Sequence, residues 1–234
     1  MIKPNNKDKN SKKIQVQSMF NDIAARYDLI NKIMTFNMDK SWRSMVCKIV
    51  LQENPTTIID IATGTGDVAF NLARINNQVT GIDNAEQMLE IANKKNTSTN
   101  IHFKLEDAEK MSFQDESFDA ATVSFGVRNF EDLSKGLSEI KRVLRPGGKL
   151  VILETAVPPF FIFRAGYFLY TTLIVPILGK LIAQNQNAYK YLSDSAKYFP
   201  HGKEFKILLE KSGFNQVDIL YPSLGIVNIY IANS

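Results

Sequence analysis

Cysteine and histidine are scarce in this chain of 234 residues. The one cysteine is Cys47, and the two histidines are His102 and His201. A single thiol can form no disulfide within the chain and no cluster of cysteine ligands. Two histidines are too few for a histidine-rich metal centre, so we expect no bound metal.

Net charge is also absent from most of the chain. Residues 1–13 contain five lysines and one aspartate and carry the whole net charge of +4, which leaves 23 basic and 23 acidic residues in the rest. A balanced body has no excess positive charge to neutralise phosphates, which argues against a nucleic-acid partner. We expect residues 1–13 to form a disordered basic tail that aids solubility or is attracted to an anionic membrane surface.

A third absence is an apolar run long enough to cross a membrane. The segment Pro158–Gly179 is apolar, but Arg164 and Pro176 interrupt it. Its charge-free part is about 15 residues, against the ~20 that a helical span needs. We therefore expect 158–200 to be a helical insert that covers a pocket or touches the membrane surface. Its aromatic side chains form either an isoprenoid groove or plain core, and they are Phe160, Phe161, Phe163, Tyr167, Phe168 and Tyr170.

Short apolar runs alternate with helical patterns between residues 57 and 154. This alternation predicts a parallel sheet with helices on both faces. Residues 14–54 read as helices that fold over the C-terminal edge of the sheet as a lid. We predict one α/β domain, residues 14–234, with a doubly wound, mostly parallel seven-stranded sheet. The expected strands are 57–62, 78–83, 101–105, 120–125, 149–154 and an antiparallel pair, 216–221 and 225–232.

The first strand runs into a glycine-rich turn, and the second strand ends on a carboxylate. The turn contains Gly64 and Gly66, and the second run, VTGID, closes on Asp83. Glycine lets backbone approach a ligand where a Cβ would collide. A carboxylate at the tip of the second strand can accept hydrogen bonds from a ribose. This arrangement predicts a nucleotide-like cofactor.

Two cofactor classes share these elements. A dinucleotide site favours G-x-G-x-x-G, so that a pyrophosphate lies on a helix N-terminus, but here an acid, Asp67, follows the second glycine. The acids Asp60 and Asp67 favour S-adenosylmethionine, which carries a sulfonium and an ammonium and no phosphate. Asp107, after the third strand, is placed to accept the adenine amino group, and Ser124 ends the fourth strand.

This order resembles the Class I S-adenosylmethionine-dependent methyltransferases, which have a Rossmann-like fold. Further segments resemble the ubiquinone/menaquinone biosynthesis C-methyltransferase family, and they are residues 19–31, 62–67, 124–129, 142–148 and 188–192. The likeness covers about residues 14 to 232. It implies cofactor contacts at Thr65, Asp83, Asp107, Ala108 and Ser124, to which the reading of the turn adds Asp60, Thr63, Gly64 and Gly66.

The family reaction that the resemblance implies is carbon methylation of a polyprenylated quinol ring. The ring carbon is nucleophilic when the neighbouring phenol loses or shares its proton. Arg128 is the first candidate to stabilise the phenolate or to orient a water, since a guanidinium stays protonated and is no base; its alternative is a structural ion pair with Glu131 or Asp132. Asn129 and Tyr27 are candidates to bind the quinol oxygens. The alternative role of Asn129 is a helix N-cap, and that of Tyr27 is core packing.

The resemblance also sets the expected substrate and surroundings. The run Val-Arg-Asn-Phe-Glu at 127–131 resembles the menaquinone-only bacterial members, which favours demethylmenaquinol. A ubiquinone precursor, another small acceptor and a non-catalytic binding protein remain alternatives. Two departures from the family pattern, Glu154-Thr155-Ala156 and Ser223-Leu224-Gly225, lie on the substrate side. We expect a cytoplasmic protein, peripheral at the inner face of the membrane, and a homodimer.

Overall fold

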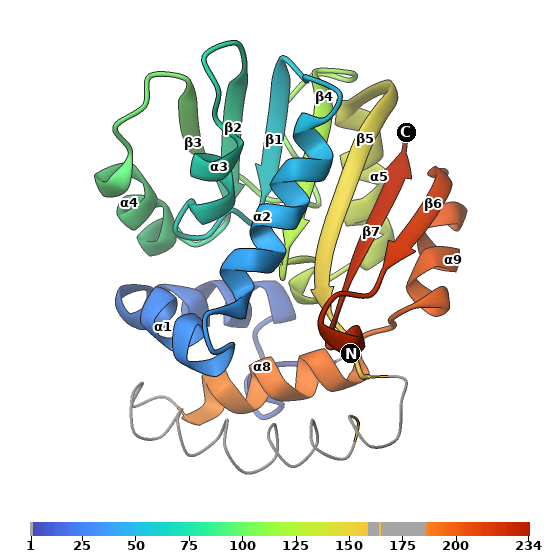
Figure 1. Cartoon of the computed structure of the whole chain (residues 1–234). Coiled ribbons are helices and arrows are strands. Elements are labelled where there is room, and N and C mark those ends of the chain that lie inside the picture. The colour runs from blue at the N-terminus through green and yellow to red at the C-terminus, as the bar shows by residue number, and fades with distance from the viewer. Residues whose placement is uncertain (1, 159–163, 165–185) are drawn as a thin grey trace.

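A seven-stranded sheet forms the centre of the protein (Figure 1), and the computed structural model describes residues 2–158, 164 and 186–234. The strand order is β3-β2-β1-β4-β5-β7-β6. The first five strands are parallel, and β7 runs antiparallel to both of its neighbours. This confirms the predicted α/β fold. The strands are β1 Thr57–Ile61, β2 Gln78–Asp83, β3 Ile101–Leu105, β4 Phe118–Ser124, β5 Leu144–Thr155, β6 Asn215–Leu220 and β7 Val227–Asn233.

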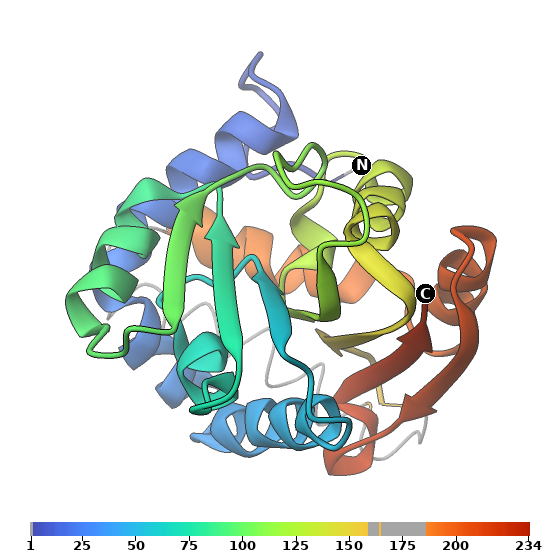
Figure 2. The same cartoon turned by 90° about the horizontal axis from the view of Figure 1, so that it is seen from above.

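Helices cover both faces of the sheet because alternate strand residues point to opposite sides. Ile59 and Ile61 pack with α5 and α9, whereas Ile58 packs with α2 and α3. Figure 2 shows α2 and α5 on opposite faces. The described helices are α1 Lys12–Met34, α2 Met38–Leu51, α3 Asp67–Leu72, α4 Glu86–Lys95, α5 Leu133–Val143, α8 Gln186–Tyr198 and α9 Lys203–Lys211, with short 3-10 turns η1 Val127–Asn129 and η3 Ser223–Gly225.

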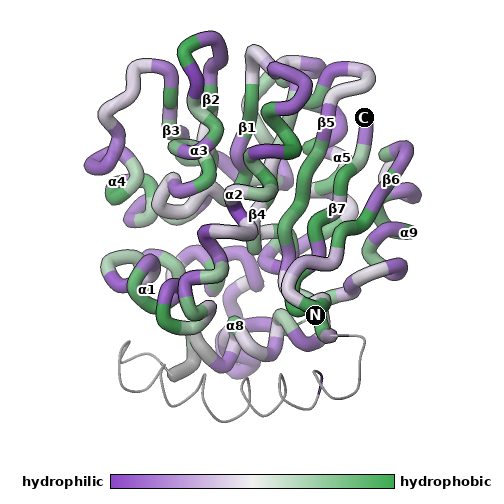
Figure 3. Tube along the Cα trace, in the orientation of Figure 1, coloured by the Kyte–Doolittle hydropathy of each residue, from purple (hydrophilic) through white to green (hydrophobic). Residues whose placement is uncertain are grey.

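Burial is deepest along the middle strands. Ile58, Ile59 and Ile61 of β1 and 150–153 of β5 are fully buried, and Figure 3 shows the hydrophobic stretch that runs along β5. A parallel strand with helices on both faces is apolar along its length. The central strands were therefore readable as continuous apolar runs.

Of the two helices expected to cover the C-terminal edge of the sheet, α1 lies there and α2 does not. Trp42, Val46 and Val50 of α2 pack on the face of the sheet, because their spacing gives the helix one apolar side. α1 instead lies at the C-terminal ends of the parallel strands, beside α8 (Figure 1). The prediction that both N-terminal helices cover this edge is wrong for α2.

The insert before the last two strands contains α8. Its Ala188 and Tyr191 are buried with Ile23 of α1 and Met88 of α4. The aromatic residues expected to form an isoprenoid groove lie outside the described residues. In the part of the chain that is described, none of the helices has the length and apolarity to cross a membrane.

Gly66 gives a direct test of how the turn is packed. Its φ is +88°, and a Cβ at this position would lie 2.8 Å from Phe70 and 2.9 Å from Phe103. We expect Gly66→Ala to lower the free energy of unfolding by about 2–5 kcal/mol, from left-handed backbone strain and overpacking together. Urea unfolding measures the change.

Gly147→Ala is the matched control. Gly147 has a φ of +76°, but no other atom lies within 4 Å of the place that a Cβ would take. The control should lose about 1–2 kcal/mol from backbone strain alone. Equal losses for the two variants would contradict the packing argument.

Candidate active site

A cavity lies at the C-terminal ends of β1, β2 and β4, beneath α1. This edge is where open α/β sheets bind ligands. The cavity brings together many of the predicted site residues, namely Tyr27, Gly64, Asp83, Asp107, Ala108, Ser124 and Asn129. The predicted residues Asp60, Thr63, Thr65, Gly66 and Arg128 are not among its lining.

Asp83 joins the glycine turn to the end of β2. One carboxylate oxygen accepts from the Gly64 amide (2.8 Å), and the other accepts from the Ala85 amide (2.9 Å). Burial raises the pKa of this carboxyl, and the backbone donors, including the amide of Asn84, oppose the rise. Each oxygen keeps a second lone pair. Asp83 can therefore brace the turn and accept ligand hydroxyls together.

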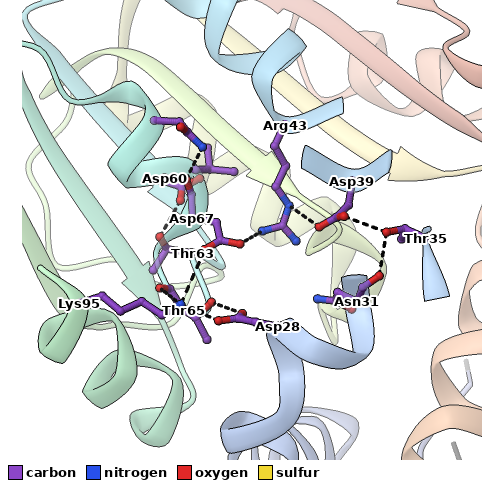
Figure 4. Close-up of polar contacts among 12 residues, drawn as sticks. Asp28, Asn31, Thr35, Asp39, Arg43, Asp60, Thr63, Thr65, Asp67 and Lys95 are labelled. Atoms are coloured by element: carbon purple, nitrogen blue, oxygen red, sulfur yellow. Dashed lines mark hydrogen bonds and ion pairs between the residues drawn. The ribbon is translucent and has the colours of Figure 1, made fainter. Parts of the chain in front are cut away.

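Asp60 of β1 is hydrogen-bonded to Thr63 of the glycine-rich turn (Figure 4). Asp60 is 1% exposed, and it accepts from the hydroxyls of Thr63 and Thr122, both at 2.6 Å. Burial raises its pKa to about 6, against the lowering effect of those two bonds. These contacts tie β1 to β4 and to the turn. Asp60 and Thr63 are bonded to each other and are not among the residues that line the cavity.

Thr65 and Asp67 connect the turn to the surrounding helices (Figure 4). The Thr65 hydroxyl donates to Asp28 of α1 (2.6 Å), which also pairs with Lys95 of α4 (2.6 Å). Asp67 pairs with Arg43 of α2 (3.1 Å). The charge of Asp67 is thus matched by a cation outside the cavity lining, and Asp67 itself is not among the residues that line the cavity.

Ser124 lines the cavity and has a buried hydroxyl without a hydrogen-bond partner in the described part of the chain. Buried polar atoms are almost always paired, so an unpaired one calls for a ligand or a water. Together with Asp83 and Asp107, this hydroxyl gives the cavity a polar lining that fits a nucleoside.

Two lysines expected in the disordered tail belong to α1. Lys12 is buried, and its Nζ donates to the carbonyls of Arg128 (2.8 Å) and Phe130 (2.6 Å). Burial lowers its pKa to about 8, although nearby Glu109 and Glu131 raise it. Lys13 lines the cavity and pairs with Asp107 (2.7 Å) and Glu109 (3.2 Å). Neither contact had a signal in the sequence, since both partners lie about a hundred residues away.

Arg128 lies in a buried polar cluster beside the cavity. Its Nη1 donates to Glu154 Oε1 (2.5 Å) and to the Phe125 carbonyl (3.0 Å). Its ion-pair partner is therefore Glu154 of β5, and not Glu131 or Asp132. Burial opposes the charge of Arg128, but Glu154, with Tyr27 and Tyr191, raises its pKa above the ordinary value.

Asn129 of η1 and Tyr27 of α1 both line the cavity. Asn129 Oδ1 accepts from the Tyr191 hydroxyl (3.2 Å). The N-cap of the following helix is Asp132, which accepts from the Lys135 amide (3.0 Å), so Asn129 does not cap it. Burial raises the pKa of Tyr191 to about 12, which keeps its phenol a hydrogen-bond donor.

The fold is that of the Class I S-adenosylmethionine-dependent methyltransferases. A solved Thermotoga maritima structure, described as an S-adenosylmethionine-dependent methyltransferase and possible histamine N-methyltransferase, has the same fold. It matches with a TM-score of 0.65 and 20% identity, over 93% of this chain and 98% of that one.

The sequence places the chain more narrowly. Residues 6–234 match the model of the ubiE/COQ5 methyltransferase family, to which this chain belongs. The demethylmenaquinone methyltransferase of Bacteroides fragilis is 40% identical over 99% of this chain and 96% of its own length. The ubiquinone/menaquinone biosynthesis C-methyltransferase UbiE of Geotalea daltonii is 38% identical over 92% of this chain and 94% of its own length. The resemblance noted in the sequence is confirmed.

Ser124→Ala should have opposite effects on stability and on ligand affinity. Without ligand, removal of an unpaired buried hydroxyl raises the free energy of unfolding by about 1 kcal/mol. Affinity for S-adenosylhomocysteine should fall by about 5- to 10-fold, the value of one hydrogen bond. Chemical unfolding and titration calorimetry measure the two effects.

Ser117→Ala is the control, because the Ser117 hydroxyl is exposed and bonded to the Gln114 carbonyl (2.7 Å). It should leave affinity unchanged. A destabilised Ser124→Ala variant with full affinity would show that the hydroxyl serves the fold and not the ligand.

Asp60 predicts a pH dependence of stability. Its folded-state pKa of about 6 lies above the ordinary value of 3.8, so its contribution is full at low pH and is lost as the pH rises through 6. Between pH 4 and pH 7 the wild type should lose up to roughly 3 kcal/mol relative to Asp60→Asn. Urea unfolding of both proteins at each pH measures the difference. A difference in the free energy of unfolding that stays constant from pH 4 to pH 7 would contradict the assignment.

Proposed function

We propose that this enzyme methylates a ring carbon of a prenylated quinol, and that the quinol is demethylmenaquinol. The observation that carries the proposal is the buried guanidinium of Arg128 beside the cofactor cavity, next to Asn129. A fixed cation in a dry site stabilises a phenolate far better than water does. The names of the relatives from Bacteroides fragilis and Geotalea daltonii support the same acceptor class.

Two groups of residues serve the cofactor, one by direct contact and one by holding the turn. Bound S-adenosylmethionine supplies an electrophilic methyl group. On our proposal Asp83 binds its ribose, Asp107 and Ala108 its adenine, and the Gly64 turn and Ser124 its remaining polar groups. Asp60, Thr63, Thr65 and Gly66 act indirectly, because they hold the turn. Every predicted cofactor residue thus keeps a role, either in contact with the cofactor or in support of the turn that contacts it.

On the acceptor side, the chain holds the phenol and favours its ionised form. Arg128 stabilises the phenolate, since its charge persists at every physiological pH. Asn129 and Tyr27 orient the quinol oxygens so that the ring carbon faces the methyl group, which converts an encounter into an oriented reaction. Peripheral contact with the membrane and a homodimer remain predictions that accompany a prenylated substrate.

The direct test is a methylation assay with purified enzyme. We expect reduced demethylmenaquinone and S-adenosylmethionine to give a product heavier by one methylene. The corresponding ubiquinone precursor, assayed in parallel, decides between the two quinols. Turnover on neither, with cofactor binding intact, would reject the proposed acceptor class.

Arg128→Ala should lower turnover by on the order of 100-fold, as expected for loss of one donor to a developing oxyanion. Its removal also leaves the buried Glu154 unpaired, which costs stability, so Arg128→Lys is assayed beside it. Arg74→Ala, at an exposed arginine, is the control and should keep full turnover. Binding of S-adenosylhomocysteine shows that each variant is folded. Unchanged turnover in Arg128→Ala would remove Arg128 from the mechanism.

A further inference from the structure

Two lysines begin α1, at the end of a helix where the dipole favours acidic residues. Ser11 is the N-cap, Lys12 and Lys13 follow it, and the first turn contains no acid. A cation at a helix N-terminus is unfavourable by itself, and a local rule that is broken in this way often marks a functional position. Lys12 is accounted for by the carbonyls of Arg128 and Phe130, to which it donates. Lys13 has no such place in the fold, since its contacts lie at the cavity.

Lys13 differs from Lys12 because it lines the cavity. Among the described residues of the lining it is the one cation. Its Nζ lies 2.7 Å from Asp107 Oδ2 and 3.2 Å from Glu109 Oε2. Burial lowers the pKa of this ammonium, but the bonds to the two carboxylates outweigh burial and raise the pKa above its ordinary value. Lys13 is therefore charged at neutral pH and has all three of its N–H donors.

One of these three donors is uncommitted. In the described part of the chain, the side-chain partners of Lys13 are two carboxylates, Asp107 and Glu109, and an ammonium has a third N–H. The Lys13 side chain is 28% exposed, against 5% for Glu109, so the third N–H can meet a ligand in the cavity. Asp107 Oδ2 lies next to this donor and keeps a second lone pair. The cavity thus offers a donor and an acceptor side by side.

Adenine has an edge that matches this pair. Its amino group donates a hydrogen bond, and the neighbouring ring nitrogen N7 accepts one. An adjacent acceptor and donor on a protein recognise adenine through these two atoms, as amide side chains do when they bind it in a bidentate manner. Lys13 and Asp107 supply the same combination with an ammonium and a carboxylate.

We propose that Lys13 is a cofactor-binding residue that donates to N7 of the adenine, while Asp107 accepts from the adenine amino group. This role rests on the proposed placement of the adenine at Asp107. Glu109 holds the ammonium from the buried side, and no covalent bond is made or broken. α1 then contributes a ligand contact to the cofactor site, in addition to lying over the cavity.

The test removes single acceptor atoms from the ligand. S-adenosylhomocysteine is compared with its 7-deaza and 1-deaza forms, in each of which C–H replaces one ring nitrogen, and calorimetry measures the affinity of the full chain for each. The wild type should bind the 7-deaza form about 5- to 10-fold more weakly than S-adenosylhomocysteine, the value of one hydrogen bond. Lys13→Met should bind these two ligands equally, with its affinity for S-adenosylhomocysteine lowered by a similar factor.

Two variants and one ligand serve as controls. Lys13→Arg keeps a charged donor and should retain a weaker affinity for the 7-deaza form. Lys104→Met removes an exposed lysine of β3 whose Nζ lies over the Phe113 ring, 4.9 Å from its centroid, and should behave as the wild type does. The 1-deaza form tests the other ring nitrogen beside the amino group. Any loss of affinity that it causes should be the same in the wild type and in Lys13→Met.

Three results would overturn the role of Lys13. The first is equal binding of S-adenosylhomocysteine and its 7-deaza form by the wild type, which decides the matter even if Lys13→Met does not fold. The second is a weaker affinity for the 7-deaza form that persists in Lys13→Met. The third is tighter binding of S-adenosylhomocysteine by Lys13→Met, which would show that Lys13 competes with the adenine for Asp107.

Asp107→Ala separates the role of Lys13 from the function proposed above. If this variant keeps full affinity for S-adenosylhomocysteine, the adenine does not lie at Asp107, and the N7 contact is rejected with that placement. If it loses affinity while the wild type binds the 7-deaza form at full strength, the N7 contact alone is rejected. An enzyme that shows the predicted affinities but does not methylate a prenylated quinol rejects only the proposed acceptor.

Discussion

The buried carboxylate of Asp60 is the interaction on which the cofactor side of the site depends. It is bonded to Thr63 in the turn and to Thr122 in β4, so it fixes the turn against two adjacent strands. Asp83 fixes the other side of the turn through the Gly64 amide. The turn that contains Gly64 is thus hydrogen-bonded from two sides, by Asp60 and by Asp83.

The proposed acceptor side depends on the same kind of constraint, a buried charge held by distant partners. Glu154 of β5 orients Arg128 of η1, and Lys12 of α1 bonds the carbonyls of Arg128 and Phe130. Breaking a buried ion pair costs several kcal/mol, which favours one arrangement of these groups. α1 thus joins both halves of the site, since Asp28 bonds the cofactor turn and Lys12 bonds the acceptor turn.

Much of this could be predicted from the sequence, because buried parallel strands are apolar runs that end on glycine or a carboxylate. The turn, Asp83 and Ser124 follow from that pattern. Contacts between residues on different strands do not follow from it. Glu154 meets Arg128 because β4 and β5 are neighbours in the sheet, and the strand order cannot be read from hydrophobic periodicity. For the same reason, the sequence did not reveal the ion pair between Asp67 and Arg43. Lys12 and Lys13 were assigned to a tail because their partners are remote in the chain.

The central claim is that this site directs a methyl group to the ring carbon of a quinol. The most direct measurement uses S-adenosylmethionine labelled with carbon-13 in its methyl group, reduced demethylmenaquinone and purified enzyme, followed by carbon NMR of the product. The account predicts the label on a ring carbon. A label on a phenolic oxygen, or on no part of the quinone, would contradict it.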